Sequence, residues 1–224
     1  GGYAWVLHDG RVQDATNHCY GLAFVLLAYA HALQAGLPEA RAYLDETFEL
    51  MEQRFWLPEH GLYADVASAD WSTLDGYRGQ NANMHACEAM IYCYAATGER
   101  RYIERAETLA HAITVRQAAL ANNLIWEHYK QDWSVDWEYN LHDKTNIYRP
   151  WGYQPGHHTE WAKLLLQLDA HLVQHGVGAA QGVGQKGVLL LQVGVKRVQV
   201  NTDAGEQADQ CGNILTRRLF VEGN

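Results

Sequence analysis

The chain of 224 residues has few features of a membrane protein, a disulfide-stabilised fold or a nucleic-acid-binding protein. No apolar run approaches the roughly 20 residues that cross a bilayer, and no signal-peptide pattern is present. The 4 cysteines form no CxxC pair and no metal-ligand spacing, which predicts reduced, buried thiols in a cytoplasmic protein. A net charge of -9 argues against nucleic acid as the main partner.

Tryptophan and tyrosine are missing from the last part of the chain. All 8 tryptophans lie before residue 162 and all 13 tyrosines before residue 154, so Leu172–Asn224 has neither. We therefore predict a folded domain over residues 1–171 and an atypical tail over residues 172–224, rich in Gly, Val and Gln. The tail is explained either by a flexible or weakly β-forming extension or by coding sequence read out of frame. We favour the second explanation and assign the tail no function.

What the first part does contain is a repeated helical pattern. Two mostly apolar segments end at a glycine, and each is followed by an amphipathic segment with charges between its apolar positions. A third apolar segment follows a long loop. The apolar segments are 17–35, 81–97 and 156–171, and the amphipathic segments are 38–55 and 99–119.

Alternating buried and half-exposed helices predict helical hairpins arranged side by side, with the apolar helices lining a common axis. The long loops Trp56–Gln80 and Asn122–Pro155 contain strand-like pieces and many aromatic residues. The predicted fold class is all-α, with short β-hairpin-like loops. The first turns of the inner helices and the long loops should then meet at one end.

Two of these apolar helices carry the pattern His-x-x-Glu, as His85 with Glu88 and His157 with Glu160. Residues three apart share a helix face, so each pattern places an imidazole beside a carboxylate. Asn81 lies one turn before His85 and extends its polar stripe, which favours a stripe facing a cavity because buried polar groups need partners.

His157 lies in the first turn of its helix, where the positive end of the helix dipole disfavours the imidazolium form. A neutral imidazole is a competent base, and Glu160 could orient it or stabilise its charged form. A buried histidine that only supports the core is equally compatible with this pattern. We also predict no metal, because the di-metal carboxylate bundles use the reversed order Glu-x-x-His with further glutamates.

The loop tryptophans and tyrosines fit stacking against a sugar as well as packing of the helix ends, and the sequence leaves both readings open. These residues are Trp126, Trp133, Trp137, Tyr139, Tyr148 and Trp151.

Three segments resemble the N-acylglucosamine 2-epimerase superfamily, which includes mannose isomerase, other aldose–ketose isomerases and cellobiose 2-epimerase. They are RGQNANMHACEAM at residues 78–90, WGYQPGHHTEWAKLLL at residues 151–166 and the stretch of residues 1–30. The motif NANMH is most similar to the mannose isomerase branch. The resemblance covers about residues 1–170.

This resemblance implies an (α/α)6 barrel and proton transfer at C2 of a reducing monosaccharide or other small sugar, through an enediol. It implies a catalytic base–acid role for His157, supported by Glu160. Substrate contacts are implied for Arg78, Asn81, His85 and Tyr20, and Glu88, on the same stripe as His85, is predicted to bind substrate with them. No metal or other cofactor is implied. Neither a nucleic acid nor a membrane is expected as a partner, whereas a homo-oligomer is.

Family members have a hairpin before the first residue of this chain and further hairpins, with a second catalytic histidine, after His157. We therefore expect an incomplete barrel, and a 224-residue polypeptide with little or no turnover of its own. Two other functions remain open. One is a non-catalytic carbohydrate-binding module, and the other is an (α/α)6 glycoside hydrolase or lyase that uses Glu88 and Glu160 as acid and base.

Overall fold

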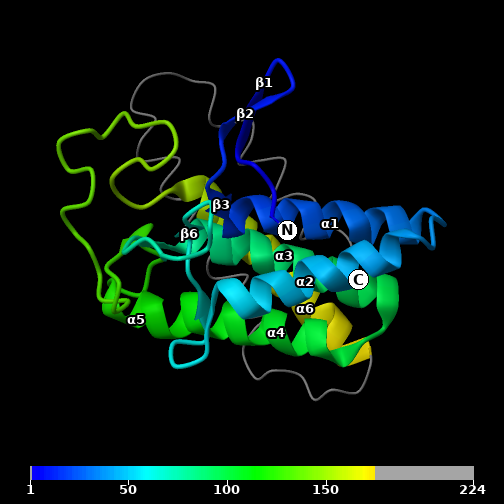
Figure 1. The fold of residues 1–224 in the computed structure, drawn as a ribbon. Helices are drawn as coiled ribbons and strands as arrows, with labels where there is room; N and C mark the ends of the chain where they lie inside the picture. The colour runs from blue at the N-terminus through cyan, green and yellow to red at the C-terminus, as the bar shows by residue number, and fades with distance from the viewer. Residues whose placement is uncertain (1, 175–224) are drawn as a thin grey trace, which may run out of the picture.

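The computed structural model describes residues 2–174, which form a layered arrangement of helices with short strands in the connecting loops (Figure 1). In chain order the elements are β1 Val6–His8, β2 Arg11–Asp14, β3 Asn17–His18, α1 Cys19–Gln34, α2 Ala40–Arg54, β4 Trp56–Leu57, β5 Leu62–Tyr63, β6 Val66–Ala67, β7 Arg78–Gly79, α3 Gln80–Thr97, α4 Arg100–His111, the π-helix η1 Ala112–Gln117, α5 Ala118–Leu120, β8 His128–Tyr129 and α6 Pro155–Gln174.

The helices pair as the sequence pattern predicts. Helix α1 packs against α2 and α3, and α3 packs in turn against α4 and α6. The apolar helices α1, α3 and α6 are therefore the inner ones, and the amphipathic helices α2 and α4 cover them. This confirms the prediction of side-by-side helical hairpins for the described residues.

Glycines follow two of the inner helices, α1 and α3, for a conformational reason. Gly98 follows α3 in the left-handed region, with φ at +72°, and its N–H donates to the carbonyl of Tyr94 at 2.8 Å. Gly36 follows α1 with φ at +89°. Because a β-carbon is disfavoured at positive φ, glycine is the natural residue at both positions.

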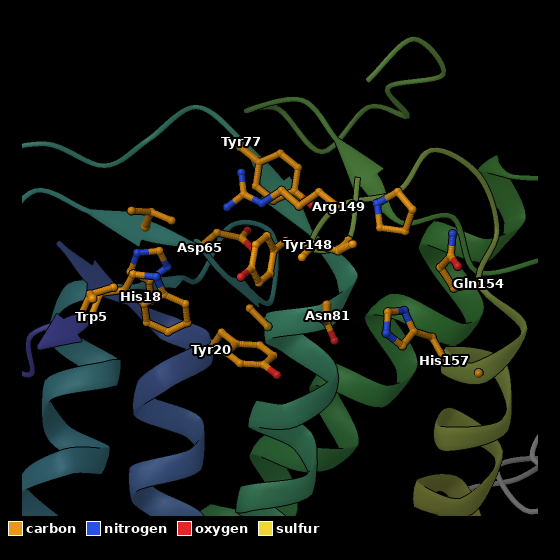
Figure 2. A pocket seen from close by; sticks show the side chains of 16 residues that line it. Trp5, His18, Tyr20, Asp65, Tyr77, Asn81, Tyr148, Arg149, Gln154 and His157 are labelled. Atoms are coloured by element: carbon orange, nitrogen blue, oxygen red, sulfur yellow. The ribbon is translucent and has the colours of Figure 1, made fainter. Parts of the chain in front are cut away.

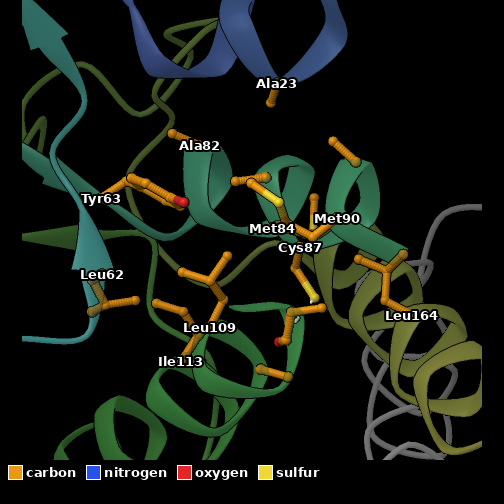
Figure 3. Close-up of a cluster of buried hydrophobic side chains, with 14 of the residues drawn as sticks. Ala23, Leu62, Tyr63, Ala82, Met84, Cys87, Met90, Leu109, Ile113 and Leu164 are labelled. Carbon is orange, nitrogen blue, oxygen red and sulfur yellow. Dashed lines mark hydrogen bonds between the residues drawn. The ribbon is translucent and has the colours of Figure 1, made fainter. Parts of the chain in front are cut away.

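Side chains from the helices and from the loops between them fill the core (Figure 3). Met84, Cys87 and Met90 of α3 are fully buried, and Leu109 of α4 and Leu164 of α6 pack into the same cluster. Full burial of one such side chain stabilises the fold by about 1.5–3 kcal/mol. Cys87 is a buried free thiol, as are Cys19 and Cys93, whereas Cys211 lies outside the described residues.

Helix α1 is more exposed than its composition predicts. Phe24, on the side of α1 that faces His85 of α3, is 40% exposed. Phe24 packs with one side against the rings of Tyr20 and His85, at 4.9 and 4.7 Å between ring centroids, and the rest of its surface is uncovered by residues 2–174. Helix α3, packed between α1, α4 and α6, is buried as expected.

Two pairs of short antiparallel strands hold the loops over the helix ends. β3 pairs with β6 directly before α1 begins, and β7 pairs with β8 directly before α3 begins. The loops gather at the end where β3 and β6 are labelled in Figure 1. The strand pairs thus place loop side chains next to the first turns of the inner helices, as predicted.

Helix α6 runs to Gln174, three residues past the boundary proposed at residue 171. The rest of the proposed tail, residues 175–224, lies outside the described residues. Within residues 2–174, no helix combines the length and apolar character needed to cross a bilayer.

Candidate active site

A cavity of about 770 Å³ opens where the long loops meet the first turns of the inner helices. Figure 2 shows Tyr20, Asn81 and His157 on three neighbouring helices, with loop side chains above them. The polar and aromatic side chains that line it are Trp5, His18, Tyr20, Asp65, Tyr77, Asn81, Tyr148, Arg149, Gln154 and His157. Its size falls within the range typical of small-molecule sites.

Three of the predicted site residues therefore converge here. Tyr20 comes from α1, Asn81 from α3 and His157 from α6, each from the first turn of its helix. The Oδ1 atom of Asn81 is buried and accepts no hydrogen bond from the described residues. A buried acceptor of this kind is suited to a donor supplied by a ligand, such as a sugar hydroxyl.

His157 is held through one ring nitrogen. Its Nδ1 lies 2.9 Å from Oε2 of Glu127 and 2.9 Å from Nε2 of Gln80, and those two partner atoms are 3.0 Å apart. Among the described residues, Nε2 of His157 has no hydrogen-bond partner. His157 also lines the cavity, so this second nitrogen is the one available to a bound molecule.

The neighbouring His158 has the opposite character. It is fully buried, its Nδ1 donates to the carbonyl of Gln154 at 2.9 Å, and its Nε2 accepts from the N–H of Ile125 at 3.2 Å. Both nitrogens are occupied by backbone groups, so His158 supports the packing of the loop on α6. Adjacent helical residues point about 100° apart, which explains the two roles.

The carboxylate bound to His157 is Glu127, which corrects the prediction that Glu160 orients the ring. Glu160 is exposed on the next turn of α6 and acts on the ring only as a nearby charge. Glu127 was missed because it lies 30 residues away along the chain. Only the pairing of β7 with β8 brings it beside Gln80 and His157.

The pKa of His157 is shifted in the direction opposite to the one that the helix dipole predicts. Burial lowers the pKa of His157. The hydrogen bond and charge of Glu127, with a smaller effect of Glu160, raise the pKa by more than burial lowers it, so the net shift is upward. The ring is thus a stronger base than the dipole alone implies.

Loop residues that the sequence did not indicate form the opposite wall. Asp65 accepts from the N–H of Gly79 at 2.8 Å, and burial raises the pKa of Asp65 to about 7, against the opposing effects of that bond, Arg149 and Arg78. Arg149 stacks on the ring of Tyr77, with its guanidinium carbon 3.9 Å from the ring centre. This wall thus presents a carboxyl group and a guanidinium to the cavity.

Trp5 and His18 form a further part of the lining. Their rings stack with centroids 4.0 Å apart and planes at 17°. Thr16 donates its hydroxyl hydrogen to Asp14, so its oxygen accepts from Nε2 of His18 at 3.0 Å. Burial lowers the pKa of His18, against the raising effect of Asp14, which favours a neutral ring.

The predicted stripe on α3 only partly faces the cavity. Asn81 lines it, whereas His85 packs one turn further along, edge-on to Tyr20 at 5.1 Å, and bonds to Glu88 at 3.3 Å. Glu88 also accepts from Nζ of Lys163 on α6 at 2.7 Å. The hydrogen bond from His85, together with Lys163, lowers the pKa of Glu88 to about 2 despite partial burial. Glu88 therefore links α3 to α6.

Arg78 does not reach the cavity lining. Its guanidinium is buried and donates through Nη1 to the carbonyls of Asp75 and Tyr77. The prediction of a substrate contact for Arg78 is not met in this geometry, because its side chain is buried in the turn before β7, where Nη1 bonds to the turn carbonyls.

Most of the loop aromatics pack the helix ends. Trp126 and Trp133 are buried, and Trp126 contacts the rings of Trp137 and Trp151. Tyr148 is the exception, since it is 82% exposed and lines the cavity. Across residues 2–174, no three His, Cys, Asp or Glu side chains gather as ligands for a metal ion.

In chemical terms, the cavity offers the basic Nε2 of His157, several hydrogen-bonding groups and aromatic surfaces. Such a set suits the binding of an uncharged, hydroxyl-rich molecule and the movement of a proton on it. Helical hairpins around this cavity define an incomplete (α/α)6 barrel.

Comparison with known proteins identifies the class. A family model described as N-acylglucosamine 2-epimerase (GlcNAc 2-epimerase) matches residues 1–204. The chain therefore belongs to the N-acylglucosamine 2-epimerase family. A crystal structure of D-mannose isomerase superposes with a TM-score of 0.83 at 49% identity, over 88% of this chain and 49% of that one. Cellobiose 2-epimerase from Spirochaeta thermophila shares the fold, with a TM-score of 0.73 at 22% identity, over 90% of this chain and 49% of that one.

Curated relatives agree with this assignment. D-mannose isomerase from Marinomonas mediterranea is 56% identical over 170 residues, which are 75% of this chain and 43% of that protein. D-mannose isomerase from Thermobifida fusca is 42% identical over 163 residues, which are 73% of this chain and 40% of that protein. The chain thus spans less than half the length of these relatives.

Proposed function

We propose that this cavity binds the open-chain form of a reducing monosaccharide, such as D-mannose, and that His157 transfers its C2 proton during conversion of an aldose to a ketose. The observation that carries the proposal is the free Nε2 of His157 at the cavity wall, with Nδ1 tied to a buried carboxylate. The D-mannose isomerase relatives at 56% and 42% identity support the choice of reaction and sugar.

The proposed step is a proton transfer in two stages. Nε2 of neutral His157 removes the proton from C2 next to the sugar carbonyl, which gives an imidazolium ring and an enediolate with its negative charge on O1. When the hydroxyl proton on O2 moves to O1 and the imidazolium gives its proton to C1, the product is the ketose. When the imidazolium returns its proton to C2, an aldose forms again. Asn81 supports this step by accepting a hydrogen bond from a sugar hydroxyl through its unpartnered Oδ1.

The hydrolase alternative that uses Glu88 and Glu160 as acid and base has less support in this geometry. A glycosidase needs one carboxyl group that stays protonated near its working pH. Glu88 is bound by His85 and Lys163, which lower its pKa to about 2 and keep it ionised. Glu88 is also not part of the cavity lining. The non-catalytic sugar-binding module remains the second candidate, because the same cavity would serve it.

A single substitution separates these candidates. We expect His157→Asn, in the protein expressed from its complete reading frame, to lose ketose formation from D-mannose by about 100-fold or more, because general base catalysis contributes about 10²–10⁴-fold. Sugar binding, measured by calorimetry, should change little. Release of reducing ends from oligosaccharides should be undetectable in both proteins.

Two results would speak against this proposal. Turnover at the unsubstituted rate in H157N removes His157 from the mechanism. Sugar binding without any turnover in the unsubstituted protein favours the binding module. Gln154→Ala, which alters the cavity lining but not the base, serves as the control for general damage to the site.

A further inference from the structure

We propose that Glu127 is the positioning residue of the site. Its carboxylate holds the proton of His157 on Nδ1 and so leaves the lone pair of Nε2 directed at the cavity. This inference rests on the proposed function for its purpose, because a base is needed at Nε2. The hydrogen-bond geometry that carries it is independent of that function.

A contact with Trp161 fixes the orientation of the side-chain amide of Gln80. Nε1 of Trp161 lies 2.6 Å from Oε1 of Gln80, and an indole N–H can only donate. The oxygen of Gln80 therefore faces Trp161, and its amide nitrogen faces His157 and Glu127 at 2.9 and 3.0 Å. An amide NH2 group donates and does not accept.

The proton on His157 follows from this orientation. Oε2 of Glu127 is 2.9 Å from Nδ1 of His157 and also receives the amide of Gln80. If Nδ1 carried its lone pair, two acceptors would face each other at that distance unless Glu127 were protonated. With the proton on Nδ1, two donors meet one carboxylate oxygen. The 2.9 Å contact between Nδ1 and the amide nitrogen of Gln80 is then one between two donors, and the shared negative oxygen of Glu127 offsets it.

Burial strengthens the hydrogen bond between Glu127 and His157. Glu127 is 4% exposed, whereas Glu160, the other carboxylate near the ring, is exposed on α6. The backbone of Glu127 is fixed as well, because the carbonyl of Glu127 accepts from the N–H of Gln80 at 3.2 Å beside the β7–β8 pair. A charge-assisted bond in a water-poor site is worth more than the same bond at the surface.

The same contact serves the reaction after proton removal. When Nε2 has taken the C2 proton, the ring is positively charged and its Nδ1–H still points at the carboxylate of Glu127. The ion pair stabilises the imidazolium until the proton returns to the sugar. Among residues 2–174, the only other ionisable group that acts on the titration of His157 is that of Glu160. The remaining ionisable groups around the cavity are His18, Tyr20, Asp65, Tyr77, Tyr148 and Arg149.

Nitrogen NMR of the ¹⁵N-histidine-labelled chain tests this directly. His157 is assigned by the signal that disappears in H157N. Above its titration midpoint, we expect Nδ1 to be protonated and Nε2 to be unprotonated. In Glu127→Gln the midpoint should fall by about one unit or more, because a neighbouring negative charge is removed. In Glu160→Gln, the matched control, the fall should be smaller.

The spectrum of the unsubstituted chain decides the question even if E127Q does not fold. A proton on Nε2 in the neutral ring would overturn the proposal, as would an unchanged midpoint in folded E127Q. Turnover gives an independent readout. In the protein from the complete reading frame, kcat of E127Q should fall about 100-fold with KM nearly unchanged, and Glu127→Asp should restore part of it.

These measurements separate the two proposals. If His157 titrates as expected but H157N retains turnover, the proposed function fails and the positioning role stands. If H157N loses turnover but the neutral ring carries its proton on Nε2, the positioning role fails and the proposed function stands.

Discussion

At the scale of single residues, two buried carboxyl groups near the cavity differ in their partners. Glu127 receives two side-chain donors, from His157 and Gln80. Asp65 receives one backbone N–H, from Gly79, and its pKa is raised by burial to about 7. The first group is therefore suited to hold a charge, whereas the second is protonated over much of the range below neutral pH.

Asp65 should make the stability of the chain fall with rising pH. In the unfolded chain it ionises near its ordinary pKa of 3.8, whereas in the folded chain it keeps its proton up to about pH 7. Between these values the folded state binds the additional proton, so raising the pH favours unfolding. Asp65→Asn keeps an oxygen for the N–H of Gly79 but cannot ionise.

We expect the free energy of unfolding of D65N, relative to the unsubstituted chain, to increase by about 2–3 kcal/mol between pH 5 and pH 8, since each pKa unit corresponds to about 1.4 kcal/mol. Urea unfolding followed by circular dichroism at both pH values measures this difference. Parallel pH profiles for the two proteins would show that Asp65 is ionised in the folded state.

Residue-level prediction succeeded where the relevant neighbours share a helix. The contact between His85 and Glu88, and the placement of Asn81 and His157 at one site, follow from helical spacing and from helices that start at the same end. It failed where partners come from distant loops. Glu127 reaches His157 only through the β7–β8 pair, and a pattern of two-residue strands carries too little information to predict that pairing.

At the scale of elements, the helices lie within a few residues of their predicted bounds. Their apolar periodicity and the two glycines that follow α1 and α3 explain this success. The sequence did not indicate that 99–119 is divided into α4, the π-helix η1 and α5. A π-helix needs only one extra residue per turn, and periodicity over six residues cannot distinguish it from an α-helix.

Gly98 offers a test of the helix ends. We expect Gly98→Ala to lower the free energy of unfolding by about 1 kcal/mol, because φ of +72° is costly for alanine although nothing lies within 4 Å of the added carbon. Gly156→Ala is the matched control, since Gly156 also has open space but lies inside α6 without a positive φ. That change should be neutral or stabilising by about 0.5–1 kcal/mol. Equal effects of the two substitutions would contradict this account.

At the scale of the whole molecule, described residues 2–174 form an incomplete ring of hairpins whose outer helices are joined by charged contacts. Arg101 pairs with Asp45 at 2.5 Å, and Arg105 pairs with Glu52 and lies over the ring of Trp56. Its inner side is less covered. Phe24 of α1 has 40% of its surface exposed, and Tyr20 lies beside it.

Self-association of the chain into a homo-oligomer stays a prediction. The exposed apolar surface of α1 is the reason for it. We expect the sedimentation coefficient of the 224-residue chain to rise with protein concentration, because exposed apolar surface favours self-association. Phe24→Gln should weaken the rise. Val115→Gln, which changes an apolar side chain that is 46% exposed on η1, should not. A coefficient independent of concentration would contradict the expectation.

The central claim is that Nε2 of His157 removes the C2 proton of a sugar. Its most direct test is the appearance of deuterium at C2 of D-mannose, followed by NMR, when the protein from the complete reading frame is incubated with the sugar in D2O. The account predicts incorporation by the unsubstituted protein and at least about 100-fold slower incorporation by H157N. Equal rates of incorporation in the two proteins would contradict it.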